Sequence, residues 1–110
     1  MADAYKLWHG ALANMPRLSR YTLGARIDGL FLDVSEFAVQ ATYAARDQKR
    51  VLVVQANNTL DALNFFLKLA WEMKLVDNKK YLAISAPLTE VGRMLGGWKK
   101  QLGIGETPVS

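Results

Sequence analysis

The sequence has 110 residues, with 14 Lys and Arg against 10 Asp and Glu, which gives a net charge of +4 at pH 7. This length suits one domain that buries its own core, and the absence of cysteine excludes disulfides, thiolate metal sites and thiol nucleophiles. The chain also lacks a signal-peptide pattern and any uncharged apolar run of about 18 residues, the length of a membrane span. We therefore expect a soluble, cytoplasmic protein whose positive charge favours polyanions or acidic protein surfaces as partners.

Apolar residues recur at alternating steps of three and four along the chain, a spacing that predicts amphipathic helices. The first predicted helix ends at a break at residues 14–16, and the second helix follows this break. Pro16 suits the first turn of the second helix, because an N–H group at that position would have no partner within the helix. The apolar stripes of these two helices are Tyr5, Trp8, Leu12 and Met15, then Leu23, Ile27, Leu30, Val34, Phe37 and Ala41.

The third and fourth predicted helices follow breaks near residues 46–49 and at residues 77–80. Their stripes are Leu52, Ala56, Thr59, Leu63, Phe66, Ala70 and Met73, then Tyr81, Ile84, Leu88, Val91, Leu95, Trp98 and Leu102. Pro87 removes one hydrogen bond from the fourth helix, so we expect a kink near residues 83–87, which would make residues 77–84 a separate first turn.

All three breaks are short, so consecutive helices must be antiparallel neighbours. The sequence therefore predicts an all-α, antiparallel up-down-up-down four-helix bundle over residues 1–102. Residues 103–110 are predicted to be a flexible C-terminal tail.

Few residues offer catalytic or metal-binding chemistry. His9 is the only histidine, and no Asp or Glu lies three or four residues from it. Asp28, Asp33 and Glu36 are expected on different faces of the second helix, without a Glu-x-x-His motif. We therefore expect no catalytic residue, metal site, cofactor or small-molecule substrate, and no enzymatic activity.

The glycines and surplus apolar residues indicate close helix contacts. Glycine inside a helix costs about 1 kcal/mol relative to alanine, a loss that close packing can offset, either within the subunit or at a subunit interface. The third helix is apolar almost all round from Leu60 to Trp71, which favours self-association. The candidates for oligomer or helix packing are Phe65, Trp71, Gly92, Gly96, Gly97 and Trp98.

The bundle topology places ten basic residues in two clusters at opposite ends. The end that holds the first and third breaks contains Arg17, Arg20, Lys74, Lys79 and Lys80, and the opposite end contains Arg46, Lys49, Arg50, Lys99 and Lys100. Such clusters attract phosphates without reading sequence, so they are candidate sites for RNA or DNA. The alternative for each residue is a solvated surface charge.

Two motifs carry a family resemblance. The segment "PRLSRYTLGARI", residues 16–27, resembles the four-helix-bundle family that includes the large-subunit rRNA intervening-sequence proteins. The segment "EVGRMLGGWKKQL", residues 90–102, is similar to the fourth helix of the accessory variability protein (Avd) family of diversity-generating retroelements. Together, the two matches imply a resemblance over nearly the full chain.

The Avd resemblance implies a non-catalytic, basic homopentamer that binds a reverse transcriptase and its template RNA during mutagenic copying. In "LNFFLKLA" the family has two outward arginines for partner binding, and Lys68 keeps one of these charges while Asn64 replaces the other. Arg93 matches the family motif, either as a packing residue or as a nucleic-acid contact. The alternatives are a stand-alone bundle of the intervening-sequence type, acting as a structural or RNA-binding scaffold, and a purely structural oligomer.

Overall fold

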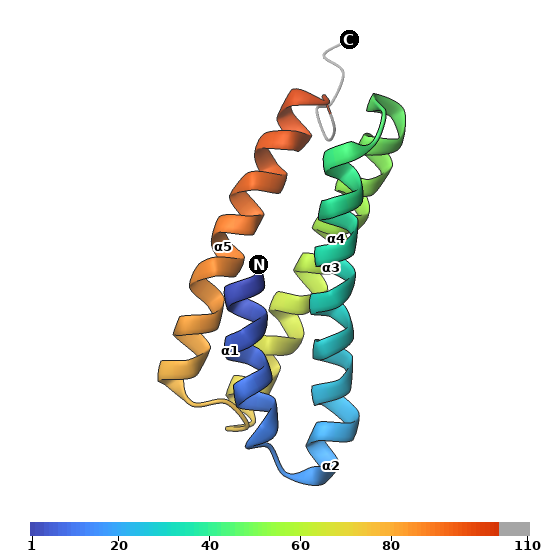
Figure 1. The fold of residues 1–110 in the computed structure, drawn as a ribbon. Coiled ribbons are helices and arrows are strands. Elements are labelled where there is room, and N and C mark those ends of the chain that lie inside the picture. The colour runs from blue at the N-terminus through green and yellow to red at the C-terminus, as the bar shows by residue number, and fades with distance from the viewer. Residues whose placement is uncertain (104–110) are drawn as a thin grey trace.

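The protein is described from a computed structural model, in which residues 1–103 are placed. The last seven residues, which make up most of the predicted tail, lie outside the described residues. Helices account for nearly all of the described chain, as Figure 1 shows. They are α1 (Ala2–Ala13), α2 (Arg17–Ser19), the π-helix η1 (Arg20–Gly24), α3 (Ala25–Tyr43), α4 (Arg46–Glu72) and α5 (Asn78–Gln101). Because α2, η1 and α3 follow one another without a break, the fold is the predicted all-α four-helix bundle.

The helices form an elongated bundle with extents of 50 × 26 × 21 Å. Helix α1 packs against α5 and α3, α3 packs against α4, and α4 packs against α5. The turns at residues 14–16 and 73–77 lie at one end, which we call the two-turn end (Figure 1). The α3–α4 turn and the C-terminus of α5 lie at the opposite end, the one-turn end. Because α1 is short, it accompanies the other helices only from the two-turn end to about the middle of the bundle (Figure 1).

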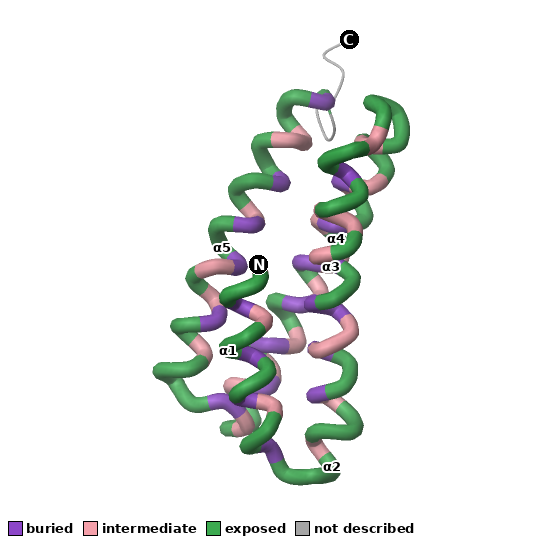
Figure 2. Tube along the Cα trace, in the orientation of Figure 1, coloured by how far each residue is buried: buried purple, intermediate pink, exposed green. Residues whose placement is uncertain are grey.

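The main core lies where all four helices meet, and Figure 2 shows its buried residues on the inner sides of the helices. Trp8 and Phe31 are both fully buried there, and their rings stack with centroids 5.9 Å apart. A second, smaller core cluster at the one-turn end consists of Ala41, Val53 and Leu102. The predicted stripes of the first, second and fourth helices all lie on buried or half-buried positions.

The predicted stripe of the third helix is wrong at Met73 and omits two residues of the main core. The buried residues of α4 are Val53, Ala56, Leu60, Leu63, Leu67 and Ala70. Leu60 and Leu67, which lie outside the predicted stripe, therefore belong to the core, while Met73 is 56% exposed. Because α4 is apolar on several sides, the three-and-four spacing fits more than one stripe, and only packing against α3 and α5 selects one.

The start of the second helix differs from the prediction in two ways. Pro16 has a non-helical ψ of 146°, so the helix begins one residue later, at Arg17. The π-helix η1 was not predicted, and it ends at the buried residue Gly24. A Cβ atom on Gly24 would lie only 2.6 Å from Leu12 Cδ1 and 3.2 Å from the carbonyl oxygen of Ser19. Glycine at this position therefore lets α1 approach η1 closely.

Helix α5 runs without interruption through Pro87, so the separate first turn expected at residues 77–84 is wrong. Asp77 caps the helix, because its side chain accepts a hydrogen bond of 2.8 Å from the backbone N–H of Lys80. Ile84 and Leu88, on either side of Pro87, are both buried. Their packing offsets the hydrogen bond that the proline removes.

Candidate nucleic-acid and partner interface

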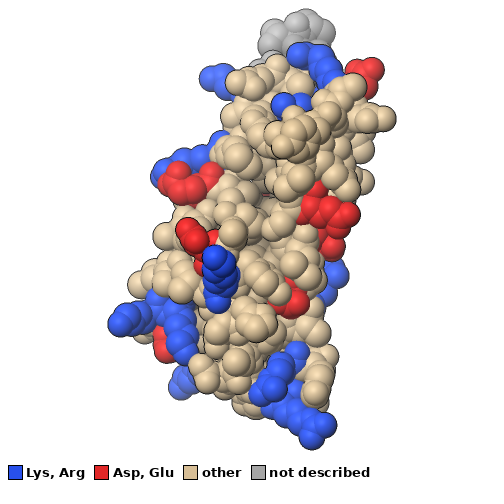
Figure 3. Space-filling model, in the orientation of Figure 1, with Lys and Arg blue, Asp and Glu red and all other residues tan. Residues whose placement is uncertain are grey.

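The basic residues gather at the two ends of the bundle, as the topology predicted (Figure 3). The two-turn end carries Arg17, Arg20, Lys74, Lys79 and Lys80, and the one-turn end carries Arg46, Lys49, Arg50, Lys99 and Lys100. Most of the Asp and Glu residues on the visible face lie between the ends (Figure 3). The protein therefore presents two separate cationic surfaces along a 50 Å axis.

Four of the candidate basic residues have contacts within the subunit: Arg20, Lys49, Arg93 and, at a longer distance from the ring of Tyr21, Arg17. Arg20 donates from Nη2 to the carbonyl oxygen of Met15 at 3.1 Å, which fixes the turn between α1 and α2. Lys49 lies 4.9 Å from the ring centroid of Trp98, and this cation–π contact joins the start of α4 to the end of α5.

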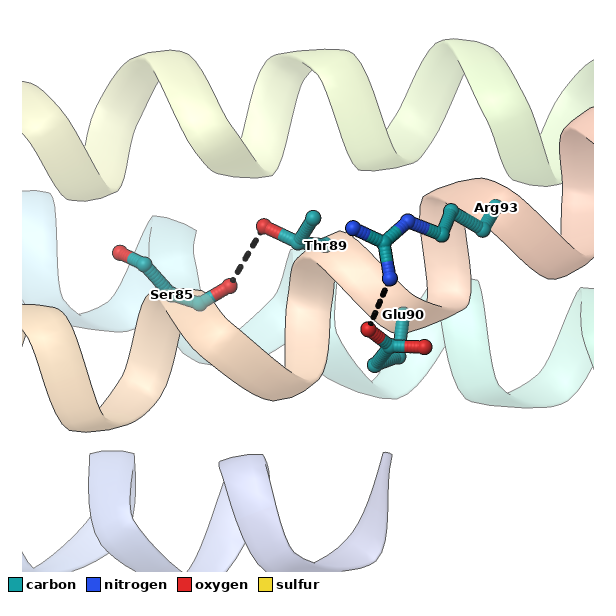
Figure 4. A network of polar contacts seen from close by, with 4 residues as sticks. All are labelled: Ser85, Thr89, Glu90 and Arg93. Carbon is teal, nitrogen blue, oxygen red and sulfur yellow. Dashed lines mark hydrogen bonds and ion pairs between the residues drawn. The ribbon is translucent and has the colours of Figure 1, made fainter.

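Arg93 pairs with Glu90 one turn earlier on α5, and both side chains are exposed (Figure 4). Figure 4 also shows the hydroxyl of Thr89, which donates to the carbonyl oxygen of Ser85 at 3.1 Å. The polar contacts of this segment therefore stay on α5 and hold no neighbouring helix.

The remaining basic candidates keep their charge available. The Arg93–Glu90 pair is the only ion pair among residues 1–103, so no carboxylate neutralises the others at contact distance. Lys68 is exposed on α4, as expected from its place outside the buried stripe. Arg17 lies 5.8 Å from the ring centroid of Tyr21, which is 67% exposed, so an aromatic ring and a cation sit together at the two-turn end.

An apolar stripe follows the outer side of α4. Successive residues of a helix are about 100° apart, which places this stripe opposite the buried position Leu60. Phe65 is 64% exposed and contacts Phe66 edge to face, with centroids 5.2 Å apart. We call this surface the outer stripe; its members are Val51, Val54, Phe65, Leu69 and Met73.

Two of the predicted packing residues act within the subunit. Trp71 stacks on Tyr81 with centroids 5.0 Å apart and donates a hydrogen bond to Asn78, so it joins α4 to α5. Trp98 is half-buried and packs against both core clusters.

The glycines of α5 make no tight contact inside the subunit. A Cβ atom on Gly92 would lie 3.6 Å from Leu60 Cδ2, an ordinary van der Waals distance. A Cβ atom on Gly96 or Gly97 would meet nothing within 4 Å. Close packing within the subunit is therefore the wrong explanation for Gly96 and Gly97, and the subunit interface stays a prediction.

A cleft that the sequence analysis missed lies between α1 and the start of α5 and has a volume of about 540 Å³. Its lining residues are Lys6, Leu7, Gly10, Ala11, Asn14, Asp77, Lys79, Lys80 and Ala83. Lys79 and Lys80 were predicted as part of the basic cluster, whereas Lys6 and Asn14 were not. Their only signal in the sequence is the spacing of four that places Lys6, Gly10 and Asn14 on one face of α1.

A partly buried polar contact joins α1 to α3. The indole N–H of Trp8 donates to Asp28 Oδ1 at 3.2 Å. Hydrogen bonding to Asp28, together with burial and the negative charge of Asp28, raises the pKa of Tyr5 above its ordinary value. Because Trp8, Tyr5 and Asp28 interact with one another, we assign this contact to the packing of α1 against α3.

No group of three or more His, Asp or Glu residues comes together within residues 1–103. His9 is exposed beside the ring of Tyr5. None of the helices in this part of the chain combines the length and the apolar character that a membrane crossing needs.

Comparison with known protein families matches residues 2–102 to the family described as bAvd-like. No match was found among curated proteins or solved structures. The family match spans every helix of the bundle, from α1 to the end of α5.

Proposed function

The chain belongs to the bAvd-like family, and on this premise we propose that it is a non-catalytic accessory subunit of a diversity-generating retroelement. In this role it binds the reverse transcriptase and the template RNA of the element and supports mutagenic copying. The observation that carries the proposal is the match of residues 2–102 to this family, over a bundle with two basic ends.

The basic ends support RNA binding on physical grounds. Phosphates are attracted to clustered Lys and Arg, and the release of counterions makes this attraction fall steeply as salt rises. Eight candidate residues, all outside the pairs formed by Arg20, Lys49 and Arg93, are available for such contacts: Arg17, Arg46, Arg50, Lys68, Lys79, Lys80, Lys99 and Lys100. Because these residues are spread along the bundle and do not line a single groove, we expect them to bind the RNA backbone with little sequence preference.

The outer stripe supports self-association. It leaves Val51, Phe65 and Met73 each more than half exposed on one side of α4, and a surface of this kind is typical of an interface. The proposed assembly is a homopentamer, in which one face of each subunit contacts a different face of the next. A ring would also present the basic ends several times, so that weak contacts add through avidity.

The experiment compares the wild-type protein with the triple variant Arg46→Glu, Arg50→Glu, Lys68→Glu. Because all three side chains project from α4, away from its buried stripe, we expect the melting curve and the assembly size to change little; exposed charges usually contribute within about 0.5 kcal/mol. Capture of the cognate reverse transcriptase and retention of template RNA at low salt should both fall strongly. Arg26→Glu, an exposed reversal outside both clusters, is the matched control and should bind as the wild type does.

Each possible outcome has a clear meaning. Wild-type capture of the reverse transcriptase by a correctly assembled triple variant would refute docking through these charges. RNA retention without any capture of the enzyme would favour the stand-alone scaffold. Light scattering that gives the 12.3 kDa monomer at micromolar concentration would refute the ring.

A further inference from the structure

The cleft between α1 and α5 has the chemistry of a nucleotide site. We propose that it binds an unpaired nucleotide, with the base on an apolar floor and the phosphate against Lys6, Lys79 and Lys80. The choice of RNA as the source of this nucleotide rests on the proposed function, whereas the choice of a nucleotide rests on the cleft itself.

The floor of the cleft suits a flat ring. Leu7 is 47% exposed there, and Ala11 and Ala83 add only methyl groups. A Cβ atom on Gly10 would have no neighbour within 4 Å, so the backbone of α1 lies open at this position. A planar base can therefore approach the helix more closely than it could beside a larger side chain.

The size of the cleft also favours a nucleotide. Its volume of about 540 Å³ falls within the range of small-ligand sites. Along α1 the lining extends from Lys6 to Asn14, about 12 Å at 1.5 Å per residue. This length holds one or two nucleotides and is too short for a partner helix of several turns.

The rim supplies positive charge. Lys6, Lys79 and Lys80 line the cleft against a single carboxylate, Asp77, and none of the three lysines forms an ion pair in the described part of the chain. One oxygen of Asp77 is already used, since it accepts the N-cap hydrogen bond from the backbone of Lys80. A phosphate placed among the three ammonium groups would neutralise charge that has no other partner.

Two acceptors at the edge of the cleft suggest which bases fit. The amide nitrogen of Asn14 donates to the carbonyl oxygen of Gly10 at 3.3 Å, which leaves its own oxygen Oδ1 as an acceptor. Asp77 Oδ2 is the second acceptor. Adenine, cytosine and guanine carry amino groups whose two N–H donors can reach both oxygens, whereas uracil offers only the single donor N3–H. We therefore expect oligo(A) to bind more tightly than oligo(U).

The test uses the full chain with fluorescent ten-nucleotide oligo(A) and oligo(U), a duplex RNA of equal length, and free AMP as competitor. Gly10→Leu should fill the floor without disturbing the fold, because the position is open and leucine favours helix. We expect about tenfold weaker oligo(A) binding, the loss typical of one base contact, with duplex binding unchanged. Gly29→Leu is the matched control in another helix and should bind as the wild type does.

Oligo(A) binding by Gly10→Leu equal to that of the wild type would overturn the proposal, as would an equal loss for oligo(A) and duplex. Competition by AMP, with no binding of either oligonucleotide, would support a nucleotide site and overturn RNA as its source. If polyglutamate competes as well as AMP, and Gly10→Leu does not change this competition, the ligand of the cleft is an acidic peptide and not a nucleotide. If Gly10→Leu loses oligo(A) binding but the wild-type protein captures no reverse transcriptase, the nucleotide site in the cleft stands and only the proposed function is refuted.

Discussion

The two halves of the bundle are built differently. In the half toward the two-turn end, four helices surround the main core, and the aromatic rings of Trp8 and Phe31 stack in its interior. In the half toward the one-turn end, α1 is absent and three helices bury a small cluster of Ala41, Val53 and Leu102 (Figures 1 and 2). Buried apolar area is the main source of stability, so the four-helix half should determine the stability of the whole.

The three-helix half leaves apolar surface exposed near its turn. Val39, Tyr43 and Val51 are each more than half exposed and line a groove of about 690 Å³ where α3 meets α4. Arg46 and Arg50 lie in the same region. Burial is therefore concentrated in the four-helix half, while apolar and basic side chains lie together near the α3–α4 turn, the composition of a binding surface.

The sharpest test of this comparison replaces one tryptophan in each half with alanine. Trp8 is fully buried and also donates to Asp28, so Trp8→Ala should lower the free energy of unfolding by about 3–5 kcal/mol. Trp98 is half-buried, so Trp98→Ala should cost about 1–2 kcal/mol through lost packing and the lost Lys49 contact. Urea unfolding followed by circular dichroism measures both, and equal losses would refute the unequal halves.

The sequence predicted most of the fold because the helices have one clear apolar side. Every residue in the stripes of the first, second and fourth helices lies at a buried or half-buried position, although the second stripe omits Phe31, which is fully buried. The register of α4 could not be predicted, because Leu60 and Met73 are equally apolar and only tertiary packing buries one of them. The close approach of Leu12 to Gly24 could not be predicted for a related reason, because these residues are far apart in the sequence.

In the candidate interface, only the positions of the basic clusters could be predicted, because they follow from the bundle topology. Placing the turns at two ends was enough to place the basic clusters. The cleft was not predictable, because it requires Lys6 of α1 and Lys79 of α5 to face the same space, and their separation in sequence gives no sign of this. The partners of Arg20 and Lys49 were likewise invisible, since both depend on geometry at the ends of the helices.

A second test concerns how tightly α1 is attached to the four-helix half. In Gly24→Ala the new Cβ would lie 2.6 Å from Leu12 Cδ1 and close to a backbone oxygen that cannot move freely, so we expect a loss of about 1–3 kcal/mol. Gly29→Ala is the control, because its Cβ meets nothing within 4 Å and alanine should add up to about 1 kcal/mol. Thermal melts of both variants give the comparison. Stabilisation by both substitutions would mean that α1 does not press against η1.

The smallest expected effect is at the turn that closes the four-helix half, residues 73–77. Lys74 has a φ of 61°, and the N–H of Leu75 donates to the carbonyl oxygen of Ala70 at 2.9 Å, the pattern of a glycine-type C-cap. A non-glycine residue in this left-handed conformation costs about 1–2 kcal/mol. Glycine avoids this cost, but part of the gain is lost because glycine makes the unfolded chain more flexible. Lys74→Gly should therefore stabilise the protein by about 0.5–1 kcal/mol in urea unfolding. Lys74→Ala removes the same charge but keeps Cβ, so it should leave the urea midpoint nearly unchanged; a glycine variant no more stable than the alanine variant would show that the turn carries no conformational cost.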